Sequence, residues 1–310
     1  MRSLTRFIAA GMLAVSAFAA NAATIAYGEA FDTLYRIDLD ARQATRIGVA
    51  GMYAGQTIGN ISGLTTAVDG SLYAIAGATK FLLKIDATGG LATVVGDLGL
   101  RGSGSGQFDA LDLGMTADCS GNLWLSSGVL KQLWKVDSKT GATTLVGSTA
   151  HPIAGLVFRA GTLYGSGSRE DHGFYRVDQE SGIAALIGTF GPSASSAINS
   201  VSMSFDDQGV LWAVLNYVPP TTGSVTPDWS DLAKIDPATG AMTVLGPITG
   251  PDSLRQAGMK GFTIAPNQCA GPAASATEAP VGSPWAMTLL CGLLAAAALY
   301  NSPHHRRSRA

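Results

Sequence analysis

One short pattern occurs five times along this 310-residue chain. Each copy consists of two apolar or aromatic residues, a basic residue, Ile or Val, and Asp. The five copies end at Asp38, Asp86, Asp137, Asp178 and Asp236. A glycine stands ten residues after every one of these Asp residues, although the copies are separated by 41 to 58 residues. Spacing that is fixed within a unit and variable between units is typical of a repeat protein.

Each copy predicts a β-hairpin. Apolar and polar residues alternate before the Asp, as in a strand with one buried face. The Asp can accept hydrogen bonds from backbone N–H groups of a tight turn, and a glycine four residues later supplies a positive φ in four copies. The first copy has Arg42 at that position. Because residues two apart on a strand share a face, the basic residue and the Asp, such as Arg36 and Asp38, could form ion pairs within or between blades, and their five copies indicate a structural rather than a catalytic role.

A second hairpin precedes four of the five copies. Each consists of a short apolar strand, a turn with small or polar residues, and a strand with Leu next to an aromatic residue. The four segments are residues 63–74, 114–125, 155–164 and 202–213. Two hairpins give four antiparallel strands, which is the unit of one propeller blade. The sequence therefore predicts an all-β fold, a β-propeller with five four-stranded blades.

The first repeat lacks its innermost strand, and the far end of the chain supplies a replacement. Residues 261–265 follow the fifth repeat and have the character of an inner strand. If they pair with residues 24–27, the two ends of the chain share the first blade and the ring has no exposed edge. An open repeat array and a six-bladed ring with one degenerate blade are the alternatives.

Both ends of the chain differ from the repeats. Residues 1–22 have a basic start, an apolar run and a small-x-small site, Ala20-Asn21-Ala22, which together predict a signal peptide. The propeller then covers residues 23–269, and a linker rich in small residues and Pro covers residues 270–284. We expect the chain to be exported.

An apolar segment without charges covers residues 285–300, and a basic tail covers residues 301–310. A helix of this length spans about 24 Å, slightly less than a hydrocarbon core of about 30 Å, but thinning of the bilayer accommodates the difference. The arginines of the tail should stay in the cytoplasm. We expect this segment to anchor the exported protein in the inner membrane, transiently or permanently.

The net charge of the repeat region limits the kinds of partner that it can bind. Residues 23–278 contain 15 basic and 22 acidic residues, a net charge of −7, which gives no electrostatic basis for binding nucleic acid.

Cys119 and Cys269 are natural disulfide partners in an oxidising compartment, where their bond would close a loop of about 150 residues. Two exposed free thiols are the alternative.

Polar residues near the start of the predicted inner strands are the candidate ligand site. They are expected to surround the mouth of the central channel, and comprise Asn60, Ser62, Asp112, His151, Asn199 and Lys260. Such a site suits a small polar ligand, or a cation held by Asp and Asn oxygens. Solvated polar groups at the rim are the other interpretation. The sequence has no serine nucleophile elbow, no His-Glu-x-x-His motif and no phosphate-binding glycine loop, so catalysis is not evident.

The segment 113–124 (Leu-Gly-Met-Thr-Ala-Asp-Cys-Ser-Gly-Asn-Leu-Trp) resembles the repeats of NHL-type and gluconolactonase-like (SMP-type) propellers. That resemblance implies a divalent cation such as Ca²⁺ at the channel, held in this chain by Glu29, Asp112 and Asn199, and a lactonase or related hydrolase activity. Asp112 precedes Asn199 in this chain, whereas the family pattern has the Asn earlier.

The end of the chain resembles a C-terminal sorting signal of the PEP-CTERM or IPTL-CTERM kind. The residues that carry the resemblance are Pro284 and Trp285, the apolar run after them, and Arg306 and Arg307. It implies an exosortase-like membrane enzyme as a partner, and an association with extracellular matrix, surface polysaccharide or surface protein.

Two functions follow as hypotheses. The first is an exported cell-surface or matrix propeller that acts as a binding or interaction module without catalysis. The second is a divalent-cation-dependent, lactonase-like enzyme built at the central channel. A scaffold of the periplasm, held permanently by the tail, is a variant of the first.

Overall fold

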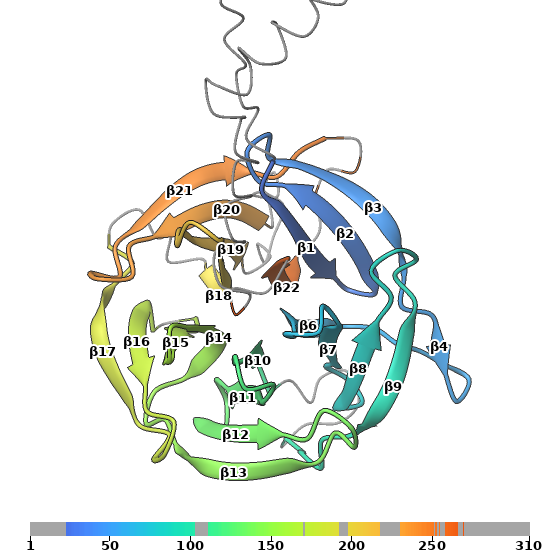
Figure 1. Cartoon of the computed structure of the whole chain (residues 1–310), viewed down its shortest axis with the longest axis horizontal. Coiled ribbons are helices and arrows are strands. Elements are labelled where there is room, and N and C mark those ends of the chain that lie inside the picture. The colour runs from blue at the N-terminus through green and yellow to red at the C-terminus, as the bar shows by residue number, and fades with distance from the viewer. Residues whose placement is uncertain are drawn as a thin grey trace, which may run out of the picture.

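The computed structural model describes residues 23–102, 111–169, 171–191, 198–217, 230–250, 252, 254, 258–265 and 269. This part of the chain contains β-strands and no α-helix. The strands form a closed ring of small sheets around a central axis (Figure 1). The predicted all-β propeller is therefore confirmed.

Five antiparallel four-stranded sheets form the blades, and the strands of each blade follow one another from the axis outward. Blade 1 contains β22 (Met259–Ile264), β1 (Ile25–Ala30), β2 (Thr33–Asp38) and β3 (Gln43–Val49). Blade 2 contains β6 (Ile61–Thr66), β7 (Leu72–Ala76), β8 (Phe81–Ile85) and β9 (Ala92–Asp97). Blade 3 contains β10 (Leu113–Ala117), β11 (Leu123–Ser127), β12 (Gln132–Val136) and β13 (Thr143–Ser148).

Blade 4 contains β14 (Ile153–Arg159), β15 (Thr162–Gly167), β16 (Gly173–Val177) and β17 (Ala184–Thr189). Blade 5 contains β18 (Ile198–Phe205), β19 (Leu211–Tyr217), β20 (Ser230–Ile235) and β21 (Met242–Pro247). A small hairpin of β4 (Met52–Tyr53) and β5 (Gln56–Thr57) projects outside the ring after blade 1 (Figure 1).

The ring closes where the sequence predicts. Strand β22 pairs antiparallel with β1, with Ala26 opposite Ile264, so the last strand of the described chain completes the first blade. A disulfide joins Cys119, in the turn between β10 and β11, to Cys269, shortly after β22. The predicted disulfide is thus confirmed, and it ties the closing segment to blade 3.

The glycine ten residues after each Asp forms the seam between neighbouring blades. A Cβ atom on Gly96 in blade 2 would lie 1.8 Å from the carbonyl oxygen of Thr140 in the outer turn of blade 3. Equivalent glycines at 48, 147 and 188 approach the next turn within 1.9 to 2.0 Å in the same way. A side chain at any of these positions would push two blades apart, so the repeat spacing sets the packing of the ring.

The seam between blades 5 and 1 is built differently. Arg42 occupies the turn position that is glycine in the other four blades, and it adopts a φ of +52°. Its guanidinium donates a hydrogen bond to the carbonyl of Leu245 in blade 5. The side chain of Arg42 therefore supplies a direct contact across the closing seam, at the cost of a left-handed backbone.

The predicted ion pairs between the repeated basic and Asp residues are wrong: the described residues show none. Each Asp instead accepts hydrogen bonds within its own turn, as Asp137 does from the backbone N–H groups of Lys139 and Thr140. Three of the lysines extend over the aromatic ring that faces them on the neighbouring strand. Lys234, for example, lies 4.1 Å from the centre of the Trp212 ring.

The apolar core lies between blades. Five clusters of buried side chains each combine residues from two neighbouring sheets. Two buried carboxylates support this core, because Asp118 and Asp206 each accept a hydrogen bond from an indole N–H, of Trp124 at 2.9 Å and of Trp212 at 2.8 Å. The inner strands β22, β6, β10, β14 and β18 remain free to line the channel (Figure 1).

Candidate functional site: the mouth of the central channel

All five inner strands run in the same direction, so their first residues meet at one end of the channel. A narrow pocket opens at this end; about 460 Å³ of space lies among its lining atoms, but most of it is open to solvent and the enclosed part has room for about one water molecule. Its polar lining comprises Asn60, Ser62, Asp112, Ser200, Ser202 and Lys260. We call it the channel-mouth pocket.

Asp112 is the central acidic group of this pocket. Its side chain is only 8% exposed, and Lys260 Nζ and Arg169 Nε each lie 3.9 Å from one of its carboxylate oxygens. Within the described residues, no hydrogen bond reaches this carboxylate. Its backbone has a φ of +46°, held in part by the hydrogen bond from the Gly128 N–H to the Asp112 carbonyl. A buried carboxylate without hydrogen bonds, on a strained backbone, is typical of a site that binds something.

The hydroxyl of Ser200 is a second incomplete group. Its Oγ is buried and has no hydrogen-bond partner among the described residues. Ser202, by contrast, donates to the backbone carbonyl of Lys260 at 3.1 Å, which fixes the inner strands of blades 5 and 1 relative to each other. The channel-mouth pocket thus combines a rigid wall with polar groups that lack partners.

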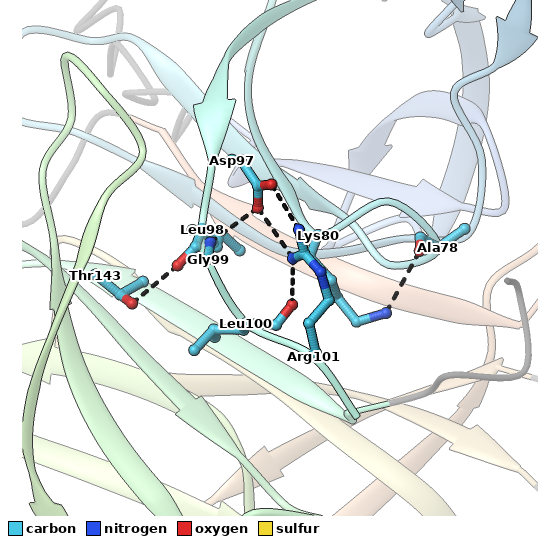
Figure 2. Close-up of polar contacts among 8 residues, drawn as sticks. All are labelled: Ala78, Lys80, Asp97, Leu98, Gly99, Leu100, Arg101 and Thr143. Atoms are coloured by element: carbon cyan, nitrogen blue, oxygen red, sulfur yellow. Dashed lines mark hydrogen bonds and ion pairs between the residues drawn. The ribbon is translucent and has the colours of Figure 1, made fainter. Parts of the chain in front are cut away.

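The wall on the blade 2 side depends on a buried lysine. Lys80 is 2% exposed, and its ammonium donates to the carbonyls of Gly77, at 2.6 Å, and Ala78, at 3.5 Å. The contact from Lys80 to Ala78 is drawn in Figure 2. Gly77 lines the channel-mouth pocket, and its N–H donates to the carbonyl of Asn60. The lysine therefore positions the segment that holds Asn60.

Beside Lys80, the segment after β9 is fixed by polar contacts (Figure 2). The carboxylate of Asp97 accepts two hydrogen bonds from Arg101, at 2.7 and 3.1 Å, and one from the Gly99 N–H. The hydrogen bonds from Arg101 are the main reason that the pKa of Asp97 is lowered. Thr143 of blade 3 donates to the carbonyl of Leu98. The connection from blade 2 to blade 3 is thus held rigidly up to residue 102.

A wider hollow adjoins the channel-mouth pocket between blades 3 and 4, and shares Asp112 with it. Val129, Pro152, Ser168, Arg169 and Asp171 line this hollow. We call it the side hollow. Asp112 lines both spaces and marks the boundary between them.

A histidine, a tyrosine and a carboxylate meet beyond the side hollow. The hydroxyl of Tyr175 donates to Asp171 at 2.8 Å and lies 3.1 Å from Nδ1 of His151. The ring of His151 packs against the tyrosine ring, with 4.6 Å between the ring centres. Burial, and then the hydrogen bond to Asp171, raises the pKa of Tyr175 above its usual range. The tyrosine therefore remains a neutral donor, and Asp171 is held in place at the edge of the hollow.

The structure brings together four of the six residues predicted for the ligand site. Asn60, Ser62, Asp112 and Lys260 line the channel-mouth pocket, but His151 and Asn199 do not. The side-chain amide of Asn199 donates to the side-chain oxygen of Asn216 at 3.4 Å. The backbone carbonyl of Asn199 accepts a hydrogen bond from the backbone N–H of Arg169. His151 faces blade 4 because Tyr175 packs against it.

Sequence reasoning missed the contributions of Ser200, Ser202 and Arg169. The two serines occupy the inner strand of blade 5 near the position that Ser62 occupies in blade 2, so aligning the blades strand by strand would have found them. Arg169 belongs to the connection between β15 and β16, which carries no repeated pattern.

Glu29 lies apart from the channel-mouth pocket. It is opposite Gly261 in the sheet of blade 1, fully buried, and neither carboxylate oxygen has a hydrogen-bond partner in the described part of the chain. Burial, with a smaller contribution from the negative charge of Asp32, raises the pKa of Glu29 to about 8. Glu29 and Asn199 thus do not line a pocket with Asp112, and no three His, Cys, Asp or Glu residues cluster for a metal ion within the described ranges. The cation site stays a prediction.

Repeats, blades and closure define the chain as a five-bladed β-propeller repeat protein. A family model described as "Repeat of unknown function (DUF6923)" matches residues 62–197, which is less than half of the chain. No curated protein sequence matches the chain significantly.

Several solved structures are similar to this fold. A chain of a nidogen/laminin complex shares 14% identity, with 79% of this chain and 100% of that chain covered and a TM-score of 0.49. A protein of unknown function from Bacteroides thetaiotaomicron VPI-5482 shares 14% identity, with 61% and 53% covered and a TM-score of 0.42. Virginiamycin B lyase from Staphylococcus aureus shares 11% identity, with 70% and 64% covered and a TM-score of 0.41. These distant likenesses identify neither a ligand nor an activity for this chain.

Proposed function

We propose that this protein is an exported propeller that acts as a binding module, and that its ligand contacts the channel-mouth pocket. The single observation that carries the proposal is the buried side chain of Asp112, which stands on a backbone of positive φ and whose carboxylate accepts no hydrogen bond in the described structure. Lys260 and Arg169 lie at ion-pair distance from this carboxylate, and its oxygens remain able to accept hydrogen bonds from a bound group. The unpartnered hydroxyl of Ser200 in the same pocket supports this interpretation.

A binding assay tests the proposal directly. The full-length protein is mixed with the isolated envelope and matrix fraction of the producing cells, and the bound protein is measured by co-sedimentation. We expect Asp112→Asn and Lys260→Met to weaken binding about tenfold or more, since each removes a charge-assisted contact. Asp207→Asn is the matched control, because Asp207 is exposed at the opposite end of the channel. Equal binding by all variants would exclude the channel mouth as the binding site.

Export is part of the same proposal. The Cys119–Cys269 disulfide supports an oxidising compartment, which in bacteria is the periplasm or the outside of the cell. The predicted signal peptide, residues 1–22, and the predicted membrane segment, residues 285–300, lie outside the described residues. Among the residues that the structure does describe, no helix is long and apolar enough to cross a membrane.

The tail is proposed to act as a sorting signal for an exosortase-like enzyme, which would place the protein at the surface or in the extracellular matrix. Fractionation of cells that express the full chain or a chain ending at residue 278 tests this part. We expect the full chain in the membrane fraction or released with a shortened C-terminus, and the truncated chain in soluble form. The same distribution for both chains would contradict the sorting role.

A further inference from the structure

We propose that the side hollow binds a neutral polyhydroxylated group, such as a sugar ring, and that one of its hydroxyls reaches the channel-mouth pocket and bridges Lys260 and Asp112. This inference rests on the proposed binding function and specifies the chemical class of its ligand. It follows from the charge, the hydrogen-bond capacity and the sizes of the two adjoining spaces.

The charges of the site cancel. Two basic side chains, Lys260 and Arg169, face two acidic ones, Asp112 and Asp171. An anionic ligand in the channel-mouth pocket would lie beside the Asp112 carboxylate, and a divalent cation there would lie beside the Lys260 ammonium. Both arrangements place like charges close together with little water between them. A neutral ligand avoids both conflicts.

The gap between Lys260 and Asp112 has the right width for a hydroxyl. Their charged atoms are 3.9 Å apart, which is longer than a hydrogen bond. A hydroxyl is both donor and acceptor, so one placed beside this pair can accept from the ammonium and donate to the carboxylate at normal distances. Neither an ammonium nor a carboxylate on the ligand could serve both groups in this way.

The rest of the polar lining has the same dual character. The hydroxyls of Ser62 and Ser200 and the amide of Asn60 can each donate and accept, which suits a hydroxyl that enters the pocket. The side hollow adds an apolar surface, because Val129 is 49% exposed beside Pro152. A sugar presents such apolar C–H surface between its hydroxyls, so the two spaces together suit its mixed character.

Saturation-transfer NMR and calorimetry on the full-length protein test the inference. The probes are neutral sugars (the methyl glycosides of glucose, galactose, mannose and N-acetylglucosamine, with cellobiose and lactose), glucuronate as an anion, alanine as a zwitterion, and CaCl₂. We expect at least one neutral sugar to bind, with its Kd raised about tenfold or more in Asp112→Asn and in Lys260→Met. The controls Asp207→Asn and Lys139→Met, both on exposed residues, should change that Kd less than twofold.

Other outcomes overturn the inference in distinguishable ways. Binding of glucuronate, alanine or Ca²⁺ that depends on Asp112 or Lys260, without binding of any neutral sugar, refutes the ligand class but leaves the channel mouth as a binding site. Sugar binding that both variants retain refutes the site. No binding of any probe refutes this inference, and the proposed function then stands or falls on whether the same variants lose co-sedimentation with the envelope and matrix fraction.

Discussion

Glu29 makes the stability of the closing blade dependent on pH. Glu29 lies on β1, which pairs with β22 and β2; its carboxyl group is fully buried without a hydrogen-bond partner in the described structure, and its pKa is raised from 4.5 to about 8. In the unfolded chain the group ionises above pH 4.5, whereas in the folded chain it keeps its proton up to about pH 8. Unfolding therefore releases a proton between these values, so the free energy of unfolding falls as the pH rises through this window.

The substitution Glu29→Gln isolates this effect, since Gln has the shape of the protonated acid but cannot ionise. One pKa unit corresponds to about 1.36 kcal/mol, so the penalty at pH 7 is about 3 kcal/mol in the wild type. We expect Glu29→Gln to raise the free energy of unfolding by about 2–3 kcal/mol at pH 7 and by little at pH 4, where the wild-type group is neutral in both states.

Urea unfolding of the two proteins, followed by tryptophan fluorescence from pH 4 to 9, measures the difference. The free energies of unfolding of the two proteins, plotted against pH, should coincide near pH 4 and separate progressively up to about pH 8. Asp207→Asn serves as the control, because this exposed carboxyl group should leave the wild-type curve unchanged. Parallel curves for the wild type and Glu29→Gln over the whole range would refute the assignment of a neutral, buried Glu29.

Three further perturbations follow from the fold and the site. Replacing Cys119 and Cys269 by Ser should lower the free energy of unfolding in urea by up to about 4–5 kcal/mol relative to the oxidised wild type, and the reduced wild type should show the same loss. Gly96→Ala should lower the free energy of unfolding by about 1–3 kcal/mol or more, because its Cβ would clash with the carbonyl of Thr140. An unchanged free energy of unfolding in urea would contradict the close packing of blades 2 and 3 at Gly96. Millimolar Ca²⁺ should leave the melting temperature unchanged, and a rise that Asp112→Asn abolishes would instead favour the lactonase hypothesis.

Much of the fold could be predicted from the sequence because each repeat forms its turns and strands through interactions between residues that are close in sequence. The Asp and the glycine of each outer turn act within a few residues, and Asp86, for example, accepts from the N–H of Thr88 as expected. The role of the glycine ten residues later could not be inferred in this way, because its reason is the turn of another blade. The lysine side chains were misassigned for a similar reason, since the aromatic rings beneath them belong to the neighbouring strand.

The candidate site shows the same division. The sequence indicated which inner-strand ends carry polar residues, and Asn60, Asp112 and Lys260 do line one pocket. It could not show that packing against Tyr175 turns His151 away, or that Arg169 reaches the far side of Asp112. These contacts join different blades through connections that share no repeat.

The sequence by itself thus determined the four-stranded repeat and favoured five blades, closure by residues 261–265 and the Cys119–Cys269 pair, because each depends on a local pattern or on simple pairing. Only the tertiary structure decided which polar groups are left without partners. That property depends on the distances between side chains of different blades, and Asp112, placed 3.9 Å from both Lys260 and Arg169, acquires its role only when the ring brings them together.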